Sequence, residues 1–254
     1  MIRLVVILFL SCATLSRADS VADKLTASGI AEFTAAYQAW DGAGFARAAA
    51  LFRQAGTNDT AGVTNLYWLG VAEFHRMLQL QTVAAQEEAI DAARNSAIKT
   101  LADAVKMDET LAEGHALLGT LQGMKINGSV LRGLWFGPGV AKHREAAMKW
   151  GASNPRVRYL LGMCRLHTAH NQEETREALN ILLKAEALFK AESKIPAAAL
   201  EPRWGYDSCL TFIGRAYEML GSRAEAADYF RKALEKHPQD QIARVGLRRI
   251  EEGR

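Results

Sequence analysis

Apolar residues along this chain recur with helical spacing, and the clearest example lies near its C-terminal end. Residues three and four positions apart share one face of a helix, and two such stripes flank Gly221 and Ser222. Glycine favours the left-handed turn that ends a helix, and serine caps the next one. No segment shows the strict alternation of a half-buried strand. The pattern predicts an all-α chain with a helix hairpin over residues 207–238, carried by Leu210, Ile213, Gly214, Tyr217, Ala226, Phe230, Ala233 and Pro238.

The small residue at Gly214 has counterparts upstream. Gly70, Gly119 and Gly162 each follow a leucine, and Ala36 stands at the corresponding place in the first unit. A small residue there lets the first helix of a hairpin approach the second closely. The matching second-helix residues are Ala48, Phe52 and Ala55 in the first unit, Ala97, Leu101 and Ala104 in the second, and Ala178, Leu182 and Ala185 in the fourth.

On these residues and spacings the chain resembles the tetratricopeptide-repeat (TPR) family. The resemblance implies a right-handed α-solenoid of about five antiparallel helix hairpins, whose concave wall is built from the first helix of each hairpin. We expect a single helical-repeat domain over residues 19–254, in which residues 239–254 form a charged capping helix.

The repeat is irregular, which indicates insertions. The successive small residues are 34, 49, 43 and 52 positions apart. We expect a helix extension over about 80–95, a loop over 124–139 and a further insertion over about 190–205. Loops carry function disproportionately. The apolar cluster in the second of these insertions is either a contact site for a partner protein or membrane surface, or it folds back to plug a gap; its residues are Leu134, Trp135 and Phe136.

The resemblance also implies a binding wall. Residues of the first helices that face inward without being packed are the binding candidates in such solenoids. Aromatic and methionine side chains would hold an extended peptide or a helix, with Arg215 or His75 orienting it. The alternative is that the chain's own segments fill the wall. The candidates are Tyr67, Phe74, His75, Tyr159, Met163, His167, Arg215, Glu218 and Met219.

The N-terminal residues are typical of a secretory signal. Arg3 precedes a short apolar run, and small residues follow up to Ala18. We expect cleavage there and a periplasmic or secreted protein; a lipid anchor at Cys12 is the alternative. The apolar run is shorter than the roughly 20 residues of a spanning helix, so no membrane span is expected after cleavage. Losing Arg3 and Arg17 from 31 basic residues leaves 29 against 28 acidic ones, which gives no reason to expect nucleic acid as a partner.

Motifs for catalysis are missing from the sequence. It contains no glycine-rich phosphate loop, no Gly-x-Ser-x-Gly turn and no Cys-x-x-Cys pair. His167 and His170 could share a helix face, but no third metal ligand has suitable spacing. Cys164 and Cys209 either pair in an oxidising compartment or are buried thiols. We therefore expect no enzyme activity, no catalytic residue, no metal and no cofactor.

Two functions remain open. The main prediction is a non-enzymatic protein-interaction or scaffold module of the cell envelope that binds a protein or peptide partner through the groove. The alternative is a small-molecule or lipid carrier with an apolar pocket in the same wall. The residues expected to line that pocket are Tyr67, Phe74, Tyr159 and Met163.

Overall fold

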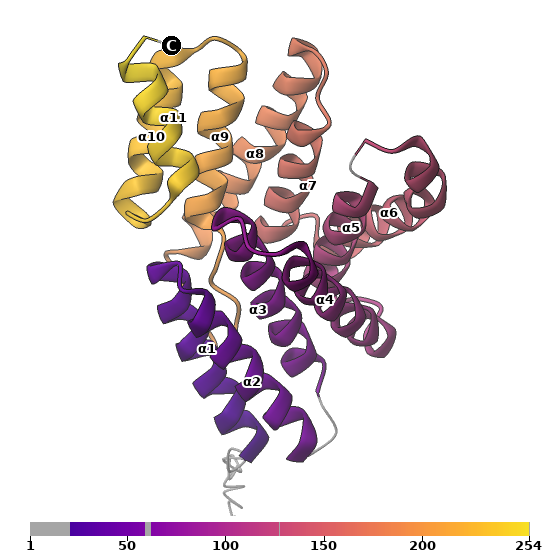
Figure 1. Cartoon of the computed structure of the whole chain (residues 1–254). Helices are drawn as coiled ribbons and strands as arrows, with labels where there is room; N and C mark the ends of the chain where they lie inside the picture. Colours follow the sequence, from indigo (N-terminus) through magenta and orange to yellow (C-terminus); the bar gives the residue numbers. More distant parts are fainter. Residues whose placement is uncertain (1–20, 59–61, 127, 254) are drawn as a thin grey trace, which may run out of the picture.

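The computed structural model describes residues 21–58, 62–126 and 128–253, so the predicted signal segment and Cys12 lie outside the described residues. Within these ranges the chain forms eleven α-helices and no strand, which confirms the all-α prediction (Figure 1). None of the described helices is both long and apolar enough to cross a membrane. The helices are α1 Val21–Ala39, α2 Gly42–Asn58, α3 Val63–Thr82, α4 Glu87–Met107, α5 Ala112–Ile126, α6 Val130–Gly151, α7 Pro155–His167, α8 Gln172–Glu192, α9 Tyr206–Met219, α10 Arg223–Lys236 and α11 Gln241–Glu251.

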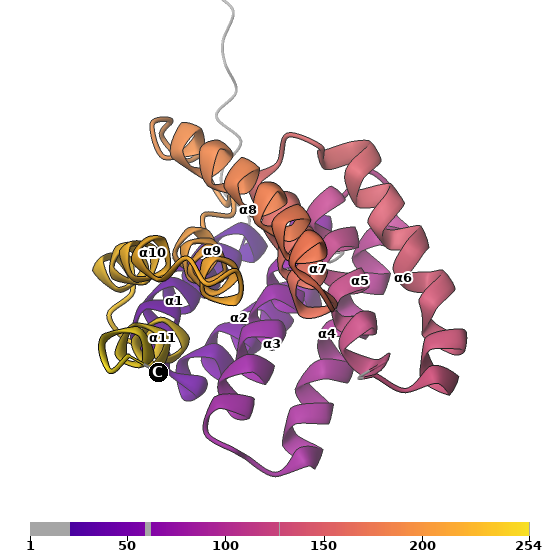
Figure 2. The same cartoon turned by 90° about the horizontal axis from the view of Figure 1, so that it is seen from above.

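Consecutive helices pair into five hairpins, as the repeat predicts. The pairs are α1 with α2, α3 with α4, α5 with α6, α7 with α8 and α9 with α10, while α11 covers the last pair. Figures 1 and 2 show the hairpins following one another along a curve. Asn154, Asn171 and Asp240 cap α7, α8 and α11 by accepting hydrogen bonds from backbone N–H groups of the first turn. Such caps satisfy donors that the helix itself leaves unpaired.

Three of the predicted small residues lie at close helix contacts. A Cβ atom at Gly70 would be 2.5 Å from Leu101 Cγ. One at Gly214 would be 2.7 Å from Phe230 Cδ1, and Gly162 has the same relation to its hairpin partner in α8. Because real Cβ atoms do not approach other carbons so closely, a side chain at these positions would push the second helix away.

The first unit uses a different small residue from the one expected. A Cβ atom at Gly29 would be 2.6 Å from Phe52 Cε1, whereas Ala36 lies against Gly44. The reason is that α1 ends at Ala39, so the turn of this hairpin follows Ala36 too closely for Ala36 to face Phe52. The assignment of Ala36 as the counterpart of Gly214 is therefore wrong.

The insertions differ in kind. The extra residues around 80–95 lengthen α3 and α4, as predicted. The predicted loop over 124–139 is wrong, because α6 begins at Val130 and runs through Pro138. Two glycines of this segment face α5: a Cβ atom would lie 3.7 Å from Ile126 at Gly133 and 2.7 Å from the Gln122 side chain at Gly139. These glycines therefore allow α5 to approach closely, and they do not interrupt α6.

The third insertion forms an irregular segment, residues 193–205, between α8 and α9. Leu200 and Gly205 have φ angles of 65° and 95°, in the left-handed region. The segment contains a turn in which the Glu201 N–H donates to the Ala198 carbonyl at 3.1 Å. In Figure 1 the segment runs beside α1 and α3, which brings it to the inner side of the solenoid.

Candidate functional site

Most of the predicted binding wall is covered by the chain itself. Tyr67, Phe74, His75, Tyr159 and Met163 are each at most 5% exposed. Contrary to expectation, these five side chains do not face an open groove. Side chains of α1 and Trp204 cover His75 and Tyr67, and Phe212 of α9 lies against Tyr159. They are core residues of the solenoid.

The covering side chains come from both ends of the chain. The centroid of the His75 ring lies 5.1 Å from that of Phe33, 5.2 Å from that of Tyr37 and 5.1 Å from that of Trp204. Trp204 Nε1 donates a hydrogen bond to the Tyr67 hydroxyl at 3.0 Å. The inner side is therefore a closed aromatic cluster, in which the polar edges of the rings are paired.

Burial changes the chemistry of His75. It lowers the pKa of His75 from 6.5 to about 4, although a contact of 2.8 Å between Nδ1 and the Val71 carbonyl works in the other direction. The imidazole is therefore neutral at neutral pH. A neutral ring inside an aromatic cluster packs as an apolar group.

We expect acid to destabilise the fold through His75. Between pH 6.5 and about 4 the unfolded chain binds a proton at this residue and the folded chain does not. The contribution of His75 to the free energy of unfolding is therefore complete above pH 6.5. It falls by about 3 kcal/mol in all as the pH decreases to about 4. His75→Phe should flatten this part of the profile when the free energy of unfolding is measured by urea denaturation at several pH values.

The control for this prediction is His170→Phe, because His170 is exposed. It should leave the pH profile unchanged. Burial and the neighbouring His115 also lower the pKa of His143 to about 4, so part of the wild-type slope should remain in His75→Phe. A variant profile as steep as the wild-type one would contradict the prediction.

Beside the aromatic cluster, a group of polar side chains joins the first helix, α1, to the last hairpin. The Tyr37 hydroxyl donates to Asp207 Oδ1 at 2.8 Å and lies 3.0 Å from Ser208 Oγ. The His237 ring stacks on Tyr37 with centroids 5.6 Å apart, and its Nδ1 lies 3.2 Å from Asp207 Oδ2. Burial, and then the Asp207 charge, raise the pKa of Tyr37. The phenol is therefore a neutral donor that ties α1 to α9.

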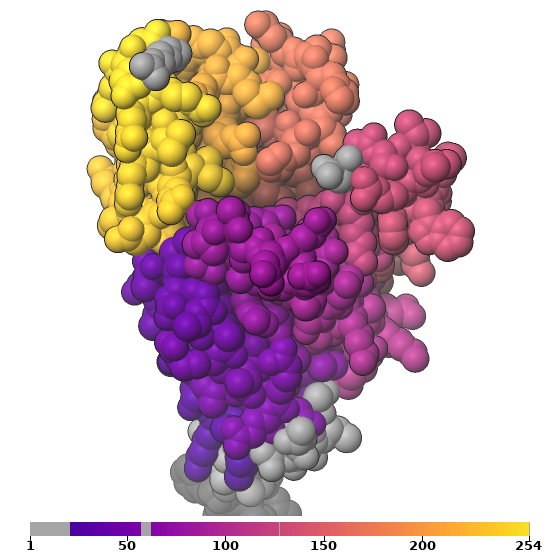
Figure 3. Space-filling view, in the orientation of Figure 1, coloured from indigo at the N-terminus to yellow at the C-terminus, as the bar shows by residue number. Residues whose placement is uncertain are grey.

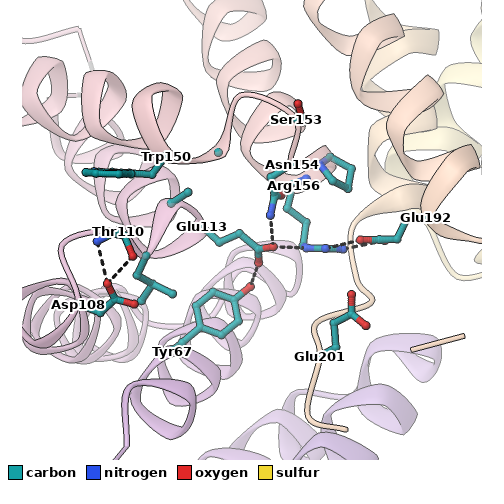
Figure 4. A pocket seen from close by; sticks show the side chains of 14 residues that line it. Tyr67, Asp108, Thr110, Glu113, Trp150, Ser153, Asn154, Arg156, Glu192 and Glu201 are labelled. Atoms are coloured by element: carbon teal, nitrogen blue, oxygen red, sulfur yellow. Dashed lines mark hydrogen bonds and ion pairs between the residues drawn. The ribbon is translucent and has the colours of Figure 1, made fainter. Parts of the chain in front are cut away.

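A depression of about 590 Å³ opens between α3, α5 and the start of α7 (Figure 4). Glu113 lies in its wall and accepts hydrogen bonds from the Tyr67 hydroxyl, from Asn154 Nδ2 at 2.7 Å and from Arg156 Nε at 2.7 Å. Arg156 also donates from Nη1 to Glu192 Oε2 at 3.0 Å. One buried guanidinium thus lies between two carboxylates from different helices.

These pairings fix the charge states of the central side chains of the network. Burial works against the charge on Arg156, but Glu113 and Glu192 outweigh it and raise its pKa. Burial and the Glu113 charge raise the pKa of Tyr67, so the phenol stays protonated. The network can hold three elements together, but it offers neither an activated nucleophile nor a free base.

Sequence reasoning missed this ion network although the repeat contains a signal for it. Glu113 and Arg156 each stand six positions before the small residue of their unit, Gly119 and Gly162. Opposite charges at one repeat position of neighbouring units lie on adjacent first helices. Aligning the units and comparing charges position by position would have paired them.

The wall remains accessible at the C-terminal end of α7 and α9. Met219 is 46% exposed, His167 is exposed, and Arg215 and Glu218 are half-buried. The Phe212 ring lies between two of them, 5.5 Å from the His167 centroid and 5.5 Å from the Arg215 guanidinium carbon. These four predicted residues form the open end of the wall.

Two charged residues at the open end, Glu218 and Arg215, differ in their ion pairing. Glu218 pairs with Arg249 at 3.0 Å. Among the described residues no carboxylate lies within 4.0 Å of the Arg215 guanidinium. Burial, opposed by Glu218 and assisted by Arg249, lowers the pKa of Arg215. This guanidinium has therefore lost part of its hydration without gaining an ion pair.

The predicted apolar cluster lies on the first two turns of α6. Leu134 is 73% exposed and Trp135 is 82% exposed, so neither fills a gap, contrary to one of the two expectations. Phe136 instead turns toward α5, where Lys125 Nζ lies 5.8 Å from its ring centroid. Trp135 and Phe136 point in different directions because consecutive residues of a helix are about 100° apart around its axis.

The described residues hold no group of three histidine, cysteine or acidic side chains that could bind a metal ion. Cys164 and Cys209 are free thiols on α7 and α9. Burial raises the pKa of both. Each therefore behaves as a small, unreactive side chain rather than as a nucleophile.

The stacked hairpins, the small residues between paired helices and the capping helix define the class of fold, a TPR-type α-solenoid. No family model matches the sequence. No curated protein sequence matches it either.

Solved structures place the fold among TPR proteins. TTC0263, a TPR protein of Thermus thermophilus, is 17% identical over 91% of this chain and 99% of its own, with a TM-score of 0.62. The Cut9-Hcn1 hetero-tetramer of the APC/C is 16% identical over 91% of this chain and 36% of that one, with a TM-score of 0.60. The HusA haemophore of Porphyromonas gingivalis is 15% identical over 79% of this chain and 94% of that one, with a TM-score of 0.58. At these identities the likeness concerns the fold alone.

Proposed function

We propose that this chain is an exported, non-enzymatic interaction module of the cell envelope, and that it binds a short segment of a protein partner at the open end of its wall. The observation that carries the proposal is the half-buried, unpaired guanidinium of Arg215. The secretory pattern up to Ala18 supports the cellular location.

A partner carboxylate would complete this site. Arginine binds carboxylates through parallel N–H donors, and such bonds are stronger than neutral ones. Folding has already removed part of the water around Arg215. A new ion pair would therefore add more to the binding free energy than it would on an open surface. Phe212 and Met219 provide an apolar contact beside it. The partner that fits is a peptide or helix with an acidic side chain next to an apolar one.

We expect Arg215→Ala to weaken peptide binding about tenfold or more, because one charge-assisted contact is worth at least about 1.4 kcal/mol. A random peptide library displayed against the protein would yield ligands, and fluorescence anisotropy would give their affinities. The selected ligands should share an acidic residue beside an apolar one.

The matched control is Arg223→Ala, since Arg223 is an exposed arginine on the adjoining α10. That change should leave affinity unchanged. A library that yields no ligand, or ligands bound equally by Arg215→Ala, would refute the proposed site.

The carrier alternative has less support. Its expected lining is buried in the core, where Tyr67 is bonded to Trp204 and Tyr159 lies against Phe212. One structural neighbour is a haemophore, but at 15% identity that likeness concerns the fold. We therefore base the proposal on Arg215 and not on a cavity.

A further inference from the structure

The start of α6 presents an apolar face to solvent. Val130, Leu131, Leu134 and Trp135 are 78%, 80%, 73% and 82% exposed. Their spacing places them on one side of the helix, and Pro138, one turn further, is exposed as well. Large apolar side chains gathered on one surface usually mark an interaction site.

The described parts of the chain leave this face uncovered. α6 packs along α5 and reaches α7 at its C-terminal end, where Gly151 lies against Val157. In Figures 2 and 3 the α5–α6 hairpin projects from the side of the molecule. The face is therefore free to meet a surface much larger than the hairpin itself.

Positive charge predominates along the exposed surface of α6. Arg132, Lys142, Arg144 and Lys149 are exposed along α6, and Glu145 is its one acidic residue. Among the described residues, none of these four cations has a carboxylate within 4.0 Å. Other exposed arginines of the chain do form ion pairs, for example Arg47, Arg231 and Arg249.

We propose that this face of α6 docks the protein on an anionic lipid bilayer. Leucine and tryptophan side chains enter the boundary between headgroups and acyl chains, where tryptophan is enriched. Unpaired lysine and arginine side chains on the same helix are attracted to anionic headgroups. The combination of exposed apolar residues with unpaired cations fits a charged membrane surface better than it fits an uncharged protein groove.

Charge also argues against a second copy of this chain as the occupant. A two-fold dimer through α6 would bring the same surface of both copies together. The cations of one copy would then face those of the other, with one glutamate per helix to offset them. Like charges opposed across an interface are unfavourable, whereas an anionic bilayer neutralises them.

This inference goes beyond the proposed function, because it uses a surface separate from Arg215. A module docked through α6 would keep the open end of its wall available to a partner. The two proposals use different residues, so either can fail without the other.

The test is co-sedimentation of the full chain with phosphatidylcholine vesicles that contain or lack phosphatidylglycerol. The N-terminal segment is identical in all variants, so differences between them report on α6. We expect binding that requires the anionic lipid and weakens with added salt. Leu134→Ala with Trp135→Ala should lower the partition coefficient roughly tenfold or more, and Lys142→Gln with Arg144→Gln should lower it on anionic vesicles alone.

Trp150→Ala is the matched control, because Trp150 is a half-exposed tryptophan at the other end of α6. It should bind vesicles like the wild type. Circular dichroism would verify that every variant is folded. Equal binding by the Leu134 and Trp135 double variant, or binding that does not depend on anionic lipid, would overturn the proposal. So would a wild-type dimer in sedimentation that the double variant loses, since it would assign the face to a second copy.

Discussion

Arg156→Ala should lower the free energy of unfolding by about 3–5 kcal/mol, because it leaves the buried carboxylate of Glu113 without its cation. Glu113 would keep the hydrogen bonds from Tyr67 and Asn154 but would lose the charge that balances it. Glu192, at the end of α8, would lose its bonds to Arg156 and keep only the longer ion pair with Arg203 at 3.9 Å. Urea denaturation followed by far-ultraviolet circular dichroism measures the effect.

Two further variants test the cause. Arg158→Ala removes an arginine on the same helix that donates to the Ala152 carbonyl at the surface, and it should change stability by about 0.5 kcal/mol or less. Replacing both members of the pair, with Glu113→Gln and Arg156→Met, should cost less than Arg156→Ala alone. If the double variant is the less stable one, the loss does not come from an unbalanced carboxylate.

Trp204→Ala should cost about 3–5 kcal/mol, as expected for truncating a large buried side chain. The indole fills the inner side of the solenoid and donates to Tyr67. Its removal exposes the His75 cluster to water. The pKa of His75, followed by NMR, should therefore rise from about 4 toward 6.5.

Trp135→Ala provides the comparison for this prediction, because it makes the same truncation at a side chain that is 82% exposed. The melting temperature should stay close to the wild-type value. A Trp204→Ala protein as stable as the wild type, with an unchanged His75 pKa, would mean that residues 193–205 do not seal the wall.

The hairpins could be predicted from the sequence because their causes are local. The Ser222 side chain does not cap α10 as predicted, but the stripe of apolar residues and the glycine at the turn lie within a few residues of each other. The contact of Gly214 with Phe230 was predictable for the same reason. Such signals depend on how a short segment folds, and the rest of the chain leaves them unchanged.

The α6 segment shows where local reasoning failed. Glycine and proline disfavour helix by about 1 and 3 kcal/mol per residue, so Gly133, Pro138 and Gly139 predicted a loop. Packing against α5 overrides those costs, since Gly139 allows the Gln122 side chain to approach. The stabilisation comes from packing against another helix, so it cannot be inferred from the composition of the segment alone.

The covering of the wall could not be predicted, because it results from contacts between distant parts of the chain. The register correctly directed Tyr67 and Tyr159 inward, but it could not tell what would meet them there. Trp204 is 137 positions from Tyr67, and Asp207 is 170 positions from Tyr37. A repeat pattern describes neighbouring units, so contacts between its first and last units fall outside what it predicts.

The bond from Tyr37 to Asp207 changes the kind of array that these repeats form. In an open solenoid each unit contacts only its neighbours, so the terminal units are held on one side and can fray independently. Here the first helix is held by the second hairpin and by the last one. The side chains of Tyr37 and His237 thereby link the two ends of the array. Fraying of either terminal unit would have to break these contacts, so each end of the array stabilises the other.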